Sequence, residues 1–486
     1  MGETVRKFGA GITKLGFKKG DVFCIFSPNC IEFAVAFHAI TSVGGIVTTC
    51  NPIYQASELN HQLCHSKAIY LLTTETFTDK AVEAVKGTKV KQTFIIGKPK
   101  KGLKSYESLL QNDGSAFPDD VKISSSDVAV LPYSSGTTGL PKGVMLTHGN
   151  IISNLAQIDH PNLVSLSPKD TLLGLLPFFH VYGMVIILNA ALRKGAKVVI
   201  MHRFEPGNFL KILQEHKVTL AHVVPPIVLF LAKHPVVDKF DLSSLKEIFS
   251  GAAPLGEEVT NLCVKRLKLD RARQGWGMTE LSPVGLISPM DGTVFGSAGG
   301  LVKNTEAKLV DVDTKKVITE PDKEGELWIR GPQVMKGYLD NEEATKNTID
   351  ADGFLHTGDI ATVDKAGNFF IVDRLKELIK YKGYQVPPAE LEALLLSHAK
   401  VADVAVIGVP DEKAGELPKA YIVKKDPSLT EEEVKEFTAQ NVAPYKKIRL
   451  VEFTDKIPKS ASGKILRRVL RAKEKASAAA ADSKAS

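Results

Sequence analysis

The segment 131–143, LPYSSGTTGLPKG, gathers side chains that could hold a polyphosphate. It directly follows the apolar run 128–131 and contains five hydroxyl side chains, three glycines and one lysine. Glycines let backbone N–H groups turn toward a ligand, the hydroxyls add donors, and Lys142 adds a positive charge. The glycine spacing differs from that of the common G-x4-G-K-S/T loop. A Gly- and Ser-rich surface loop has a similar composition, but it rarely ends in Pro-Lys-Gly after a strand.

The segment 274–280, QGWGMTE, combines two glycines with three side chains that could contact a nucleotide. Trp276 offers a stacking face, Thr279 a hydroxyl, and Glu280 a hard carboxylate oxygen of the kind that Mg²⁺ prefers. A Gly-rich turn around a core tryptophan would have the same composition. This segment alone therefore leaves both interpretations open.

Further polar residues lie near glycines later in the chain. His180 follows a predicted apolar strand, and Asp359 and Arg374 lie near Gly-rich β-segments. Lys464 ends the loop PKSASGK, just before a helix-like stretch at 465–470. Each has an ordinary alternative: a buried histidine, a turn or surface ion pair, a solvated lysine. The lysines of 376–383 have the same alternative, a solvated face.

The elements that must position these residues alternate between strand and helix. Apolar residues at helical spacing predict a helix at 5–15, and a strand-like run follows at 22–26. Further strands are predicted at 69–72, 128–131, 172–176, 196–201, 220–224 and 248–249. Alternation of this kind indicates parallel sheets covered by helices, an α/β fold.

After about residue 290 short strands alternate with Gly and Asp turns, which predicts a β-rich subdomain. Its strands include 306–310 and 325–330, and a final segment contains a helix at 391–398 with strands at 404–409 and 420–423. We expect an N-terminal domain at 1–373, a small C-terminal α+β lid domain at 374–471 and a disordered Ala-, Lys- and Ser-rich tail at 472–486.

Composition excludes several classes of protein. The chain of 486 residues is 44% apolar and 24% charged, as in ordinary globular proteins. No apolar run reaches ~18 residues, so we expect no membrane span. A net charge of +7 does not indicate nucleic acid binding at this size. Five scattered cysteines indicate a reducing compartment, and the cluster at 61–65 is interpreted as structural rather than metal-binding.

Taken together and in order, these strings resemble those of the adenylate-forming acyl-activating enzymes. That family includes 4-coumarate–CoA ligases, fatty acyl-CoA synthetases and beetle luciferases. Four strings carry the resemblance: 131–143, 274–280, 357–359 and 458–464. The resemblance runs from the first predicted helix to Arg468, and 373–385 follows the 4-coumarate–CoA ligase pattern residue by residue. It implies a large N-terminal domain and a small mobile C-terminal lid.

The resemblance also implies roles for individual residues. ATP and AMP would contact Ser134, Ser135, Gly136, Thr137, Thr138, Lys142, Gln274, Gly275, Trp276, Thr279, Asp359, Arg374 and Lys376. Glu280 would bind Mg²⁺. The catalytic residues would be Lys464, His180, Lys380 and Gln385, and CoA would contact Arg203, Lys382 and Gly383. The acyl pocket would contain Tyr182, Ile186, Phe249, Ala252 and Ala253.

The implied reaction is an acid–thiol ligation with ATP, Mg²⁺ and CoA. A carboxylate, already ionised at neutral pH, attacks the α-phosphorus of ATP, and the thiol of CoA then attacks the acyl-adenylate. Catalysis needs positioning and positive charge rather than a general base. Lys464 would serve the first step and Lys380 the second, with Lys376 as the hinge of the lid.

Two departures from the family pattern refine this expectation. Phe249 and Ile186 replace polar or small residues of the coumarate pocket, so we expect an apolar acid such as a fatty acid or a cinnamate. Family members carry about fifty residues ahead of this first helix, and without them we expect the strand 22–26 to have an unpaired edge.

The alternatives are a luciferase-like monooxygenase and a non-catalytic relative. We expect a monomer in the cytoplasm. The peroxisome is the alternative, because the C-terminus resembles but does not match a Ser-Lys-Leu signal.

Overall fold

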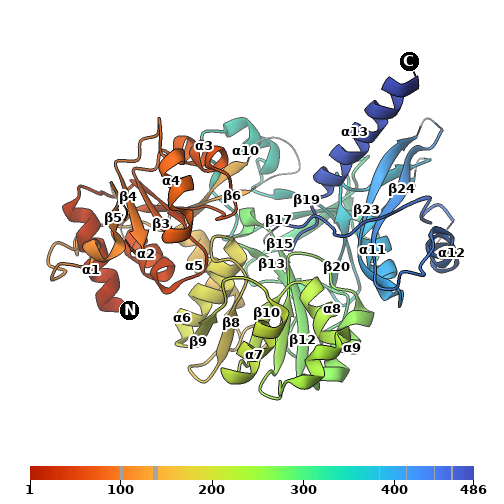
Figure 1. Ribbon diagram of the computed structural model, residues 1–486, viewed down its shortest axis with the longest axis horizontal. Coiled ribbons are helices and arrows are strands. Elements are labelled where there is room, and N and C mark those ends of the chain that lie inside the picture. The colour runs from red at the N-terminus through yellow and green to blue at the C-terminus, as the bar shows by residue number, and fades with distance from the viewer. Residues whose placement is uncertain are drawn as a thin grey trace.

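The computed structural model describes residues 1–98, 100, 102–134, 141–382, 384–411, 413–442, 444–460 and 463–485, without the side chains of 385 and 477–485. Three sheets form the N-terminal part of the molecule and a fourth forms the C-terminal part (Figure 1). The predicted fold class, α/β with parallel sheets and a β-rich part, is confirmed.

The first sheet has the order β18-β7-β6-β2-β1-β3-β4-β5. Its strands are β1 Val22–Phe26, β2 Ile46–Thr49, β3 Tyr70–Thr74, β4 Gln92–Ile96, β5 Lys104–Ser105, β6 Val128–Ser134, β7 Lys142–Thr147 and β18 Gly337–Tyr338. Strand β1 is buried throughout and pairs in parallel with β2 on one side and β3 on the other. The expected unpaired edge at 22–26 is therefore wrong, because the chain itself supplies both neighbours.

Helices of the first sheet are α1 Gly2–Lys14, α2 Ile31–Ser42, α3 Ala56–Ser66, α4 Thr78–Ala84 and α5 His148–Ile158. Helix α1 confirms the predicted first helix and buries Phe8 and Ile12. Helix α5 begins where the Thr147 hydroxyl accepts the backbone N–H of Asn150, whose side chain accepts the backbone N–H of Thr147 in return. This capping box ends β7 and starts the helix, so the strand that follows the phosphate segment is firmly anchored.

The second sheet has the order β14-β13-β12-β11-β10-β8-β9. Its strands are β8 Thr171–Gly174, β9 Lys197–Ile200, β10 Leu220–Val223, β11 Glu247–Ser250, β12 Arg271–Gly277, β13 Val284–Ile287 and β14 Gly300–Leu301. Its helices are α6 Ala190–Lys194, α7 Pro206–Glu215, α8 Pro225–Lys233 and α9 Glu257–Leu267, and a π-helical segment runs over Tyr182–Asn189. Neighbouring strands from β9 to β12 are parallel, so their carboxyl ends meet at one edge.

The third sheet is antiparallel, in the order β16-β15-β17-β19-β20. Its strands are β15 Glu306–Val310, β16 Val317–Ile318, β17 Gly325–Arg330, β19 Leu355–Val363 and β20 Phe369–Arg374, with helix α10 Glu342–Thr348 inserted between β18 and β19. The predicted strands at 306–310 and 325–330 agree with β15 and β17.

The C-terminal part contains the strands β21 Ile379–Tyr381, β22 Tyr384–Val386, β23 Val401–Asp411, β24 Gly415–Lys424 and β25 Leu450–Phe453. Its helices are α11 Pro388–Ser397, α12 Glu431–Asn441 and α13 Arg467–Ala485. The tail at 472–486 was expected to be disordered, whereas α13 extends through it to Ala485 and projects from the molecule (Figure 1). Alanine and lysine have high helix propensity, which accounts for the difference.

Buried apolar side chains form separate cores in the two parts. The largest cluster runs from Phe8 to Phe369, and a second runs from Ile379 to Val451. No residue belongs to both clusters. A boundary near 373/374 remains our proposal for the division into two domains, and the two cores support it.

Candidate functional site

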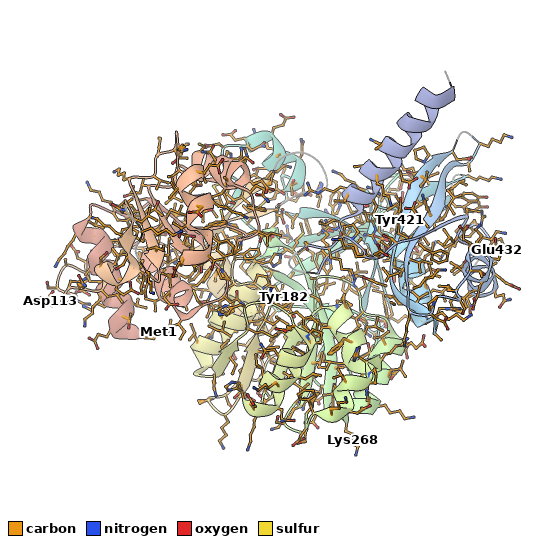
Figure 2. All side chains as sticks on the ribbon, in the orientation of Figure 1. Met1, Asp113, Tyr182, Lys268, Tyr421 and Glu432 are labelled. Carbon is orange, nitrogen blue, oxygen red and sulfur yellow. The ribbon has the colours of Figure 1, made fainter. Side chains whose placement is uncertain are left out.

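A cleft of about 630 Å³ lies where the carboxyl ends of β6, β11 and β12 face strand β19 and the loop before α13. Tyr182, labelled in Figure 2, lies near the middle of the molecule, at one wall of this cleft. The cleft brings together most of the predicted site residues: Ser134, Lys142, His180, Tyr182, Ile186, Phe249, Ala252, Gly275, Trp276, Thr279, Glu280, Asp359, Arg374, Lys376 and Lys464. Segments more than 300 residues apart in the chain thus meet at one site.

One end of the cleft is organised around the carboxylate of Glu280. Its Oε1 accepts hydrogen bonds from the hydroxyls of Ser134 and Tyr338, each at 3.0 Å. The ammonium of Lys142 lies 4.8 Å from the centre of the Tyr338 ring. The predicted residues Ser135, Gly136, Thr137 and Thr138 lie outside the described part of the chain. A carboxylate and an ammonium therefore flank the two ends of the predicted phosphate loop.

A second end of the cleft is organised around Asp359. The indole N–H of Trp276 donates to Asp359 Oδ2 at 2.8 Å, and Arg374 Nε lies 3.3 Å from Oδ1. Burial raises the pKa of Asp359, and the charge of Arg374 opposes that rise. Within the described residues Oδ1 accepts no hydrogen bond. Trp276 and Arg374 thus hold the buried carboxylate of Asp359 in a fixed orientation at this end of the cleft.

Lys464 reaches the same cleft from the C-terminal part. Its loop packs closely on the N-terminal part at Gly463, where φ is 79° and a Cβ would lie 2.9 Å from Val224 Cγ2. The Ser460 hydroxyl accepts the backbone N–H of Lys464 at 3.1 Å. Burial, followed by the charge of Arg374, lowers the pKa of Lys464 to about 8. The positive charge of Lys464 is thus only partly balanced by its neighbours. This is expected of a site that binds an anion.

His180 is held as a neutral imidazole next to Lys464. Its Nδ1 accepts the backbone N–H of Tyr182 at 3.2 Å, which places the ring proton on Nε2. Burial, followed by the charge of Lys464, lowers the pKa of His180 to about 4. His180 is therefore uncharged at neutral pH.

A third region of the cleft is lined by aromatic rings. The hydroxyl of Tyr182 lies 3.2 Å from His222 Nδ1 and 3.4 Å from the backbone oxygen of Phe249. Residue 251 is glycine, and this leaves room for the Tyr182 ring. Any other residue there would place its Cβ 2.6 Å from that ring. Burial, followed by the charge of Arg273, lowers the pKa of His222 to about 3, so this imidazole is also neutral.

The remaining wall of this region is apolar. It is formed by Ile158, Val164, Ile186, Val284 and Ile287. We did not single out His222 in the sequence, because it lies within the apolar stretch 218–224 and nothing beside it indicates a site. Only the pairing of β10 with β11 places it next to Phe249.

Some predicted residues do not line the cleft. The side chain of Gln274 binds both the backbone N–H and the backbone oxygen of Leu255, so it supports the loop 251–256 instead of reaching a ligand. Ala253 is exposed and does not line the cleft, although Ala252 before it does. The predicted second-step residues Arg203, Lys380 and Lys382 are exposed and lie outside the cleft, while Gly383 and the side chain of Gln385 lie outside the described part.

Several charged residues of the cleft were not predicted. Arg468 and Arg471 enter it from the start of α13, and Glu377 enters it from the turn after β20. Arg471 Nη2 lies 2.7 Å from Glu377 Oε2. The arginine-rich run that follows Lys464 in the sequence was the available signal for both arginines.

Comparison with known proteins supports one assignment throughout. The family described as AMP-binding enzyme matches residues 1–339, and the family described as AMP-binding enzyme C-terminal domain matches 390–464. The chain is 44% identical over 479 residues to 4-coumarate–CoA ligase 1 of Solanum tuberosum, covering 97% of this chain and 87% of that protein.

Solved structures agree with this result. ATP-bound MatB from Rhodopseudomonas palustris matches with a TM-score of 0.86 and 26% identity, over 97% of this chain and 92% of that one. The anthranilate CoA ligase AuaEII, in complex with anthranoyl-AMP, matches with a TM-score of 0.89 and 26% identity, over 98% and 92%. Within the residues that the structure describes, no helix has the length and apolarity needed to cross a bilayer.

Proposed function

The chain belongs to the family of AMP-binding enzymes, and we propose that it activates a carboxylic acid with ATP and transfers the acyl group to CoA. One observation carries this proposal. Lys464, from the C-terminal part, converges with Asp359 and Glu280 in a single cleft. The similarity to a CoA ligase over nearly the whole chain supports the same assignment.

In the first step the carboxylate attacks the α-phosphorus of ATP, a P–O bond forms, and the bond to pyrophosphate breaks. Negative charge builds up on the phosphate oxygens, so buried cations accelerate the step. We assign this role to Lys464 and Lys142. The low pKa of Lys464 supports the assignment, because burial that disfavours its charge is offset once a polyanion binds beside it.

The nucleoside is assigned to the other end of the cleft. Trp276 and Arg374 orient the carboxylate of Asp359, to which we assign the ribose hydroxyls. Thr279, which lines the cleft one residue before Glu280, would contact the α-phosphate. Ser134 and the loop that follows it would contact the outer phosphates.

The donor set beside Lys142 fits Mg²⁺. Two hydroxyls occupy Oε1 of Glu280, and among the described residues Oε2 has no hydrogen-bond partner. Mg²⁺ is commonly bound by one or two carboxylates together with substrate phosphates. When bound, it would neutralise charge on the phosphates, and Glu280 would hold it at the phosphate end of the cleft.

The second step requires a different face of the C-terminal domain. The CoA sulfur attacks the acyl carbonyl, and AMP leaves. Lys380 on β21 and Lys382 in the turn after it have exposed side chains, and both lie outside the cleft that holds Lys464. We propose that rotation about Lys376 exchanges the two faces, with Arg203, Lys382 and Gly383 then facing CoA and with Lys380 and Gln385 at the AMP end. His180 would move aside to open the acyl tunnel.

The acid is proposed to be apolar, such as a medium-chain fatty acid or an unsubstituted cinnamate. The proposed acyl region contains Phe249, Ile186 and further aliphatic side chains. Each buried CH₂ contributes ~0.8 kcal/mol, so a few methylenes outweigh one hydrogen bond of ~1 kcal/mol. A phenol facing Phe249 would lose water without a matching partner, which costs ~1–3 kcal/mol.

A panel of acids tests both levels of this proposal. Pyrophosphate release with ATP and Mg²⁺, and thioester formation with CoA, would establish the ligase. We expect kcat/KM for octanoate or cinnamate to exceed that for 4-coumarate, and Phe249→Lys to narrow the gap by hosting the hydroxyl. Preference of the unaltered enzyme for 4-coumarate over every apolar acid of similar length would refute the pocket argument alone. Absence of pyrophosphate release with all acids would refute the ligase.

The compartment and assembly are also proposals. The five cysteines are free, which fits a reducing compartment such as the cytoplasm. A monomer is proposed because the described residues that line the cleft all come from one chain. Size-exclusion chromatography with light scattering would test the monomer.

A further inference from the structure

A buried carboxylate connects the two proposed domains behind the cleft. Asp373, at the end of β20, is 6% exposed. Its Oδ1 accepts the backbone N–H of Arg374, and its Oδ2 accepts that of Ala389, both at 2.7 Å. Ala389 lies in the first turn of α11. The proposed hinge, Lys376, lies between Asp373 and Ala389 in the chain, so a rotation about it moves the two partners of the second bond relative to each other.

Helix α11 in turn is tied to the segment that carries Lys464. Glu392 of α11 accepts the backbone N–H of Val406 at 2.7 Å and pairs with Arg467 Nη2 at 2.6 Å. Arg467 Nε also donates to the backbone oxygen of Val406 at 3.1 Å. The Arg467 and Glu392 side chains are 12% and 10% exposed. Arg467 follows Lys464 by three residues, so the position of α11 fixes the position of the loop.

These three charged groups form one electrostatic cluster. Burial raises the pKa of Asp373, and the nearby charge of Arg467 opposes that rise. Asp373 and Glu392 do not line the cleft, so the chemistry proposed above does not use them. Burying a carboxylate is unfavourable unless its partners compensate, so a rotation that removes one partner changes the energy of the cluster.

We propose that Asp373 is a positioning residue of the first step. Its bond to the start of α11 holds the C-terminal domain in the orientation that places Lys464 in the cleft. The bond breaks when the domain turns for thioester formation. This inference rests on the proposed function, which supplies the two steps and the hinge.

The test measures the two half-reactions separately in Asp373→Ala. ATP–pyrophosphate exchange should fall about tenfold or more, the scale for losing a hydrogen bond to a charged group. Thioester formation from a pre-made acyl-adenylate should stay within about twofold of the unaltered enzyme, because that step does not use the bond. Glu390→Ala is the matched control. Glu390 lies on the same helix and pairs with Lys446 at 2.7 Å, inside the C-terminal domain, so it should change neither half-reaction.

A second measurement needs no substrate. Trypsin should cut the linker at Lys376, Lys380 or Lys382 faster in Asp373→Ala than in the unaltered enzyme or in Glu390→Ala, because the domain is less firmly held. If Asp373→Ala fails to fold, Asp373→Asn, which keeps one acceptor oxygen, should show the same pattern in weaker form.

Three results would overturn the inference. They are unchanged exchange in a folded variant, equal loss of both half-reactions, and unchanged cleavage of the linker. An unaltered enzyme that forms no adenylate with any acid would refute the proposed function instead, and the cleavage experiment would still decide the role of Asp373.

Discussion

The low pKa of Lys464 predicts that adenylate formation weakens at alkaline pH. An ordinary lysine has a pKa of 10.5, and burial with the repulsion of Arg374 lowers that of Lys464 to about 8. The difference corresponds to about 3 kcal/mol by which the free site disfavours the ammonium. The group is charged below its pKa, so the charge is present at pH 7 and about nine-tenths lost at pH 9. We expect kcat/KM for ATP to fall about tenfold between these two pH values.

The assay is ATP–pyrophosphate exchange, because it contains no CoA and the titration of the CoA thiol cannot contribute. In Lys464→Arg the guanidinium stays charged over the whole range, so its rate should be lower but nearly independent of pH up to 9. The ratio of the pH–rate profiles of the unaltered enzyme and Lys464→Arg separates the titration of Lys464 from that of other groups, which affect both enzymes alike. A flat profile in the unaltered enzyme, or the same alkaline fall in Lys464→Arg, would refute the reasoning.

Three further predictions follow from the same geometry. Lys464→Ala should slow pyrophosphate exchange at least ~10²-fold but spare thioester formation from a pre-made adenylate. An equal loss of both half-reactions in a folded variant would contradict this prediction. Lys380→Ala should show the reverse pattern, with exchange kept and CoA-dependent turnover impaired, and loss of exchange alone would exclude this role. Arg273 and Glu247 form a buried ion pair that does not line the cleft, with side chains 2% and 8% exposed, so Arg273→Met should leave Glu247 as an unpaired buried charge and lower the free energy of unfolding by about 3–5 kcal/mol, measured by denaturant titration. A change below about 1 kcal/mol would count against this ion pair.

The sequence predicted the parts of the site that are local. A strand followed by Gly and hydroxyl residues predicted β6 with Ser134 at its end, whereas the Gly-Lys loop alone left Lys464 open and only the family resemblance assigned it to the site. The informative residues of this segment lie close together in the chain. Glycines and hydroxyl side chains that follow a strand at this spacing rarely occur for another reason. The family resemblance then placed Asp359 and Glu280 in the same site.

Residues placed by pairing between distant strands were not predictable in this way. His222 lies in an apolar stretch that indicates a core strand, and only its register against Phe249 makes it part of the cleft. The edge expected at 22–26 was wrong for the same reason, because the neighbour β2 at 46–49 is a short strand next to two glycines that weaken its pattern. Gln274 was placed by resemblance, but its amide serves the loop at Leu255.

The burial of Lys464 also limits how firmly the C-terminal domain can be held. Without a bound polyanion, the closed arrangement keeps a poorly compensated ammonium in the cleft, which opposes closure by an amount comparable to one or two charge-assisted hydrogen bonds. The bond from Asp373 to α11 and the close packing at Gly463 act in the opposite direction. In the proposed mechanism ATP would shift this balance toward closure, because its phosphates favour the ammonium. Departure of pyrophosphate would remove much of that charge, and the cost of burying Lys464 would return. A domain held by contacts of this size would therefore close for the first step and open for the second without a separate source of energy.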